Sequence, residues 1–247
     1  MKTNRLFEQP MIYLVFGLFM LLLYVLVKLS GDDETLVTSF NFSLVLLIIS
    51  FIAYWIQYTF HQGQMRINTV SKNTPRALGI AVIMVFIIFI VSTVIGIGLG
   101  YASKFMEANS LAMVGAVPQF IILNNPLMVF IVIVFFIATL ETIVAVQIYD
   151  ILLHSIKAEY SLKDPKVWFA AILIGIGAVI NHSYSKFIPR VGQLNIHALL
   201  IVGFMFAIIC LLAVHQKEME SSIYTHIMNN FLAMMYKLKD ITNMFWI

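Results

Sequence analysis

The chain has very little cysteine and very little charge. Cys210 is the one cysteine among 247 residues, so no disulfide forms within the chain and a disulfide-stapled scaffold is excluded. Asp, Glu, Lys and Arg together make up 11% of the sequence, against about 25% in an average soluble domain. The net charge of +3 is small and spread along the chain, which argues against a nucleic-acid-binding protein.

Hydrophobic residues take the place of the missing charges. They make up 61% of the chain and occur in long continuous runs, so a soluble globular domain is excluded as well. A transmembrane helix needs about 20 mostly apolar residues. Six runs of roughly this kind cover residues 11–27, 40–60, 77–101, 126–149, 167–183 and 197–214. A seventh and more polar run, 221–236, has apolar residues at helical spacing.

These runs predict an all-α fold, a polytopic transmembrane helix bundle that forms a single membrane domain over residues 1–247. The bundle has seven spans, or eight if the mildly apolar interval 105–123 also crosses the membrane. With seven spans and the N-terminus inside, more Lys and Arg residues fall inside than outside, as the positive-inside rule requires. We therefore expect a multi-pass protein of the cytoplasmic membrane.

Four polar residues in the predicted spans are candidates for a functional site. Glu141 is surrounded by apolar residues, and no Lys or Arg lies within one helical turn of it. A carboxylate at the bilayer centre costs about 2.5–3.5 kcal/mol on insertion scales, and such residues usually have a function. His182 ends the fifth run, while His226 and Asn230, four residues apart, share one face of the seventh.

Three chemistries are open to these residues. Glu141 and a histidine that share one water form a general-base pair for hydrolysis, and a second imidazole and an amide then stabilise an oxyanion. Glu141, His182 and His226 also form a ligand set for Zn²⁺ with an open fourth position. Glu and His side chains serve as proton relays in transporters too. A shared site requires that the fourth helix continue through residues 151–156, because a helix that ends earlier places Glu141 about 15 Å from the depth of His182.

The remaining polar residues near the spans have simpler interpretations. Asp150 and His154 are also four residues apart, but charged residues follow them closely, so we interpret them as a solvated helix end. The histidines interpreted as lying at the edges of spans are His61, His197 and His215.

The order of the four candidate residues resembles the motifs of the CPBP family, the intramembrane proteins related to type II CAAX prenyl endopeptidases and bacteriocin self-immunity proteins. The first motif, Glu-Glu-x-x-x-Arg, keeps Glu141 but has Thr142 and Val146 at its other positions. The second, Phe-x-x-x-His, keeps His182, and the third, His-x-x-x-Asn, is complete at 226–230.

The resemblance covers residues 126–235 and implies a catalytic core there. It implies that Glu141 and His182 activate water, and that His226 and Asn230 stabilise the oxyanion. The protein is then an intramembrane endopeptidase that hydrolyses peptide bonds of membrane-associated or lipidated peptides. This mechanism needs no cofactor, and the alternative is Zn²⁺ held by Glu141, His182 and His226.

Two other functions remain open at this stage. One is a non-catalytic membrane protein of the same fold that acts in bacteriocin immunity or as a partner scaffold. The other is a small proton-coupled transporter that uses Glu141 as its proton site. The expected partners are membrane lipid and a membrane-associated peptide or protein, nucleic acid is not expected, and the sequence predicts no oligomeric state.

Overall fold

The computed structural model describes residues 34–61, 66–69, 73–98, 130–184 and 196–244, together with 17–18, 20–21, 24–25 and 127. These residues form helices and contain no β-strand, which confirms the all-α fold. In chain order, the helices are α2 (Glu34–Phe60), α3 (Thr74–Gly98), the π-helical η2 (Phe130–Ile137) that continues into α7 (Ala138–Ser155), α8 (Pro165–Tyr184), α9 (Ile196–Gln216) and α10 (Glu220–Met244).

Local sequence explains where several of these helices begin and end. Asp164 accepts a hydrogen bond from the Lys166 backbone N–H at 2.9 Å and caps α8, and Pro165 takes the first helical position, where a missing N–H is tolerated. Lys157 and Lys217 follow α7 and α9 in the left-handed conformation, with φ of 51° and 58°. The next backbone N–H in each case bonds to a carbonyl five residues earlier, so both helices end in the same hydrogen-bonded cap.

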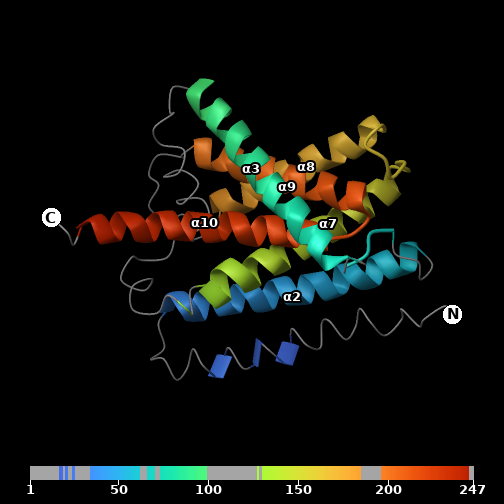
Figure 1. The fold of residues 1–247 in the computed structure, drawn as a ribbon. Coiled ribbons are helices and arrows are strands. Elements are labelled where there is room, and N and C mark those ends of the chain that lie inside the picture. Colours follow the sequence, from blue (N-terminus) through green and yellow to red (C-terminus); the bar gives the residue numbers. More distant parts are fainter. Residues whose placement is uncertain are drawn as a thin grey trace.

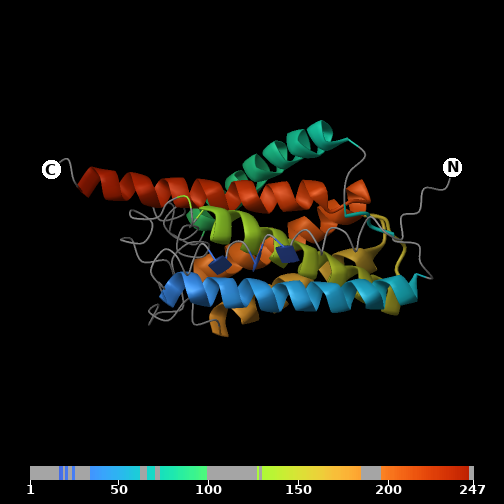
Figure 2. The same ribbon diagram turned by 90° about the horizontal axis from the view of Figure 1, so that it is seen from below.

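Helix α10, labelled in Figure 1, lies between α3 on one side and α7, η2 and α9 on the other, as Figure 2 shows. α2 and η2–α7 run side by side in the same direction (Figures 1 and 2). α8 and α9 are antiparallel and cross closely at Gly175 and Gly203. The two buried apolar clusters lie at opposite ends of α7, one around Leu140 and the other around Tyr149.

Three described helices are long and apolar enough to cross a membrane, namely Phe40–Phe60, Thr74–Val91 and Val134–Ser155. They correspond to the second, third and fourth predicted spans. Fewer described helices meet this criterion than the seven predicted. The apolar stretches described in α8 and α9 are Pro165–Asn181 and Leu200–Gln216, and α10 is more polar. The predicted first span lies mostly outside the described residues, and the interval 105–123 lies wholly outside them.

Three connecting segments meet at one end of the bundle. The Arg66 guanidinium lies 5.8 Å from the centre of the Tyr160 ring, in the connection between α7 and α8. The Asn68 backbone bonds to Lys217 O at 3.0 Å and to Met219 N at 2.8 Å, in the connection between α9 and α10. The segments that follow α2, α7 and α9 therefore lie on the same side of the molecule.

Candidate functional site between α7 and α10

Glu141 and His226 approach each other inside the bundle. His226 Nε2 lies 3.8 Å from Glu141 Oε2, and the side chains are 1% and 12% exposed. This separation is too long for a direct hydrogen bond but short enough for a charge interaction or for a shared water beside the two atoms. Two of the four predicted site residues therefore meet, from helices that lie far apart in the sequence.

The imidazole of His226 is held by groups on two further sides. Thr142 Oγ1 lies 3.0 Å from Nδ1, the ring nitrogen opposite to the one that faces Glu141. The Phe206 ring on α9 meets the imidazole edge to face, with ring centres 5.3 Å apart. Three helices thus fix the orientation of one side chain, as a proton-transfer group requires.

Asn230 lies one turn beyond His226 on α10, on the same helix face. Its side chain is 3% exposed, and Oδ1 accepts no hydrogen bond from the part of the chain that the structure describes. A buried acceptor without a donor costs about 1–3 kcal/mol, so a bound group that donates to Asn230 would recover this free energy. The neighbouring Asn229 instead contacts Met205 Sδ at 3.4 Å and has a packing role.

His182 lies in the last turn of α8, and its side chain is outside the described residues. The backbone nevertheless shows how far Glu141 and His182 lie from the ends of their helices. Because α7 continues to Ser155, Glu141 lies about 21 Å from that end along the helix, and His182 lies about 26 Å from Pro165 at 1.5 Å per residue. The depth mismatch expected for a shorter fourth helix therefore does not arise.

A metal centre is not formed by the described residues, which contain no group of three His, Cys, Asp or Glu side chains placed to hold an ion. The predicted Zn²⁺ ligand set includes His182, whose side chain lies outside those residues. The described part of the site, Glu141 with His226, has a geometry that suits acid–base chemistry.

A second buried polar cluster corrects the interpretation of Asp150 as part of a solvated helix end. Asp150 is fully buried, and its Oδ2 accepts a hydrogen bond from Gln57 Nε2 at 2.8 Å and lies 2.7 Å from His61 Nε2. The His154 ring stacks on Phe60 and remains exposed at the surface. The prediction was wrong for Asp150 because α7 continues beyond 149 and α2 covers this face of it.

Signals for this cluster were present in both helices. Gln57 and His61 are four residues apart at the end of one apolar run, and Asp150 and His154 are four apart at the end of another. Each pair lies on one face at the C-terminal end of its helix, so the two pairs are expected to contact each other if the helices run parallel. Nearby, burial and the charge of Asp150 raise the pKa of Tyr160, so this phenol stays protonated and its OH donates to Asp150 O at 3.3 Å.

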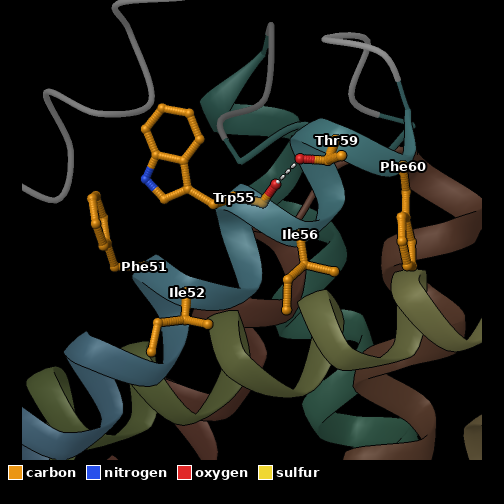
Figure 3. A pocket seen from close by; sticks show the side chains of 6 residues that line it. All are labelled: Phe51, Ile52, Trp55, Ile56, Thr59 and Phe60. Atoms are coloured by element: carbon orange, nitrogen blue, oxygen red, sulfur yellow. Dashed lines mark hydrogen bonds between the residues drawn. The ribbon is translucent and has the colours of Figure 1, made fainter.

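An apolar groove of about 390 Å³ lies on the outer face of α2 and is separate from both polar clusters. Its lining residues all come from that helix, and the hydrogen bond among them joins Thr59 Oγ1 to Trp55 O at 2.9 Å (Figure 3). Exposed aromatic and aliphatic side chains of this kind suit contact with lipid chains.

Comparisons of the chain with protein-family models, with curated proteins and with solved structures find no significant match. The resemblance to the CPBP family therefore rests on the three motifs.

Proposed function

We propose that this chain is a multi-pass intramembrane peptidase of the CPBP type that cleaves membrane-associated or lipidated peptides. The observation that carries the proposal is the approach of Glu141 to His226 within an apolar helix bundle, 3.8 Å between Oε2 and Nε2. An isolated structural carboxyl group would need neither an oriented imidazole nor the buried amide of Asn230 one turn away.

In the proposed reaction, the Glu141 carboxylate accepts a proton from a water molecule, and the water oxygen attacks the carbonyl carbon of the peptide bond. His226 and Asn230 donate hydrogen bonds to the oxyanion that forms. The C–N bond then breaks as the nitrogen takes the proton from Glu141, so one water is consumed and a carboxyl group and an amine are released. The resemblance assigns His182 to the water beside Glu141.

The departures from the family motif fit this scheme in one respect. Thr142 takes the position of the second glutamate, and its hydroxyl contacts His226 at 3.0 Å. The position therefore still contributes a polar group to the site. Val146, at the position of the arginine, is fully buried in an apolar cluster. The second glutamate and the arginine of the family motif would form a charge pair, and at the arginine position this chain has an apolar packing contact instead.

The proposal includes a topology of seven spans in the cytoplasmic membrane, with the N-terminus on the inner side. Many large apolar side chains on α2 and α3 are exposed, as lipid contact requires. The basic residues at the end where α2, α7 and α9 finish support an inside position for that end. The described examples are Arg66, Arg76, Lys157, Lys163, Lys166 and Lys217.

The proposal is tested with the purified full chain in liposomes and an internally quenched farnesylated peptide as probe. Glu141→Gln keeps the shape but removes the base, so cleavage should fall about 10²–10⁴-fold. Glu159→Gln, which changes an exposed side chain in the connection after α7, is the matched control and should cleave normally. Equal cleavage by Glu141→Gln and wild type would exclude Glu141 as the base. No cleavage by a folded wild type would favour the non-catalytic alternative.

A further inference from the structure

The hydroxyl group of Thr142 has one hydrogen and two close polar neighbours. Its Oγ1 lies 2.8 Å from the backbone oxygen of Ala138, one turn earlier in α7, and 3.0 Å from His226 Nδ1. A carbonyl oxygen carries no hydrogen, so two oxygens at 2.8 Å attract each other only when the hydroxyl hydrogen lies between them. The hydroxyl therefore donates to Ala138 and has its lone pairs left for the imidazole.

We infer that Thr142 is a positioning residue, which holds the neutral His226 ring in the tautomer with the proton on Nδ1. Nδ1–H then donates to Thr142 Oγ1, and the lone pair of Nε2 faces Glu141. In the opposite tautomer, the hydroxyl would have to donate to Nδ1, and its contact with the Ala138 oxygen would become repulsive.

The catalytic consequence rests on the proposed function, whereas the tautomer itself does not. With Nδ1 occupied by its own proton, Nε2 becomes a donor only when the ring is an imidazolium. His226 then stabilises an oxyanion as a charged group beside the Glu141 carboxylate, and one proton is shared by the pair. Thr142 thus determines which nitrogen of His226 can gain and lose a proton at the reacting centre.

The tautomer is measured by ¹⁵N solid-state NMR on the ¹⁵N-histidine-labelled full chain in lipid bilayers, at a pH where the imidazole is neutral. The chain has six histidines, so the spectrum of His226→Gln identifies the signals of this ring. We expect a protonated Nδ1 and an unprotonated Nε2 in the wild type. Thr142→Ser keeps a hydroxyl and should keep this pattern, whereas the isosteric Thr142→Val should populate the Nε2–H tautomer.

A wild-type ring protonated on Nε2 would overturn the inference, and so would an unchanged pattern in Thr142→Val. If Thr142→Val does not fold, the wild type and Thr142→Ser still decide the tautomer. On the quenched farnesylated peptide, Thr142→Val should cleave about 10–100-fold more slowly and Thr142→Ser close to normally. A wild type with the Nδ1–H ring but without cleavage would contradict the proposed function and leave the tautomer standing.

Discussion

Asp150 illustrates, at the scale of a residue, how a carboxyl group is tolerated inside an apolar bundle. It is fully buried, and its Oδ2 is shared by the Gln57 amide and the His61 imidazole, both from the end of α2. An unpaired charge in such a place would be far too costly, so these two nitrogen groups are what permits the carboxyl group there. The same contacts fasten the end of α2 to the end of α7.

We predict that Asp150→Ala strongly destabilises the fold. The substitution leaves Gln57 and His61 buried without their acceptor, and the loss of a partner in such a buried pair costs about 3–5 kcal/mol. The measurement is the free energy of unfolding in mixed micelles, with Glu159→Ala as control because its side chain is exposed in the neighbouring connection. Equal stability of the two variants would show that the cluster contributes little.

At the scale of elements, α8 and α9 cross closely at two glycines, Gly175 and Gly203. A Cβ atom added at Gly175 would lie 2.5 Å from the backbone oxygen of Gly203, which real Cβ atoms do not tolerate. The two helices therefore depend on glycine at this crossing. Gly177, on the same helix, faces open space, and a Cβ atom added there would meet nothing within 4 Å.

These two glycines supply a matched pair of variants. Gly175→Ala should destabilise the protein by about 1–3 kcal/mol, because α8 and α9 must move apart. Gly177→Ala should be neutral or stabilise by up to about 1 kcal/mol, because alanine favours the helix and meets no neighbour. Thermal unfolding of both variants in the same detergent makes the comparison. Similar losses in both would contradict the packing of α8 on α9.

The beginning of α8 predicts a dependence of stability on pH. The Lys166 backbone N–H, and secondarily that of Glu159, lowers the pKa of Asp164, because both donate to its carboxylate. Since the folded carboxyl group binds a proton less tightly than the unfolded one, its contribution is present at neutral pH. That contribution is lost as the pH falls through the folded pKa.

Asp164→Asn tests this dependence, since asparagine also caps helices but does not titrate. The melting temperature of the wild type should fall more steeply below about pH 4 than that of Asp164→Asn. The comparison is made by following helical circular dichroism during heating at a series of pH values. Parallel curves for the two proteins would exclude a contribution from the Asp164 cap.

At the scale of the whole molecule, the meeting of three connections constrains the path through the membrane. Arg66 reaches Tyr160, and Asn68 pairs with the backbone around Glu218, so these segments share one face. Helices α3 and η2–α7, which lie between the first segment and the second, are long and apolar enough to cross the membrane. We expect the three segments to lie on one face of the membrane.

Labelling of introduced cysteines measures this topology in intact cells. Arg76→Cys, Glu159→Cys and Lys217→Cys change exposed residues at this end and should all be protected from a membrane-impermeant maleimide until the cells are broken. The native Cys210 is fully buried and should stay unlabelled, which makes the wild type the control. If one site were labelled from outside the cell and another only from inside, the three segments would not lie on the same face of the membrane.

The sequence alone determined the class of the fold and the composition of the helix faces. Long apolar runs with little charge permit an all-helical bundle, because every backbone polar group must be satisfied within a span. The spacing of His226 and Asn230 places them on one face, because the helical period is a local property. Among the residues that the structure describes, three helices are long and apolar enough to cross a membrane, and the more polar α10 buries polar side chains within the bundle.

Only the tertiary structure decided which faces meet. Glu141 and Asp150 lie on opposite sides of α7, and packing alone directs the first to α10 and the second to α2. The sequence left the extension of α7 to Ser155 open, because the end of an apolar run ends a helix only if its polar residues need water. Here α2 supplies their hydrogen bonds instead, and such long-range contacts are not encoded in the periodicity of any one segment.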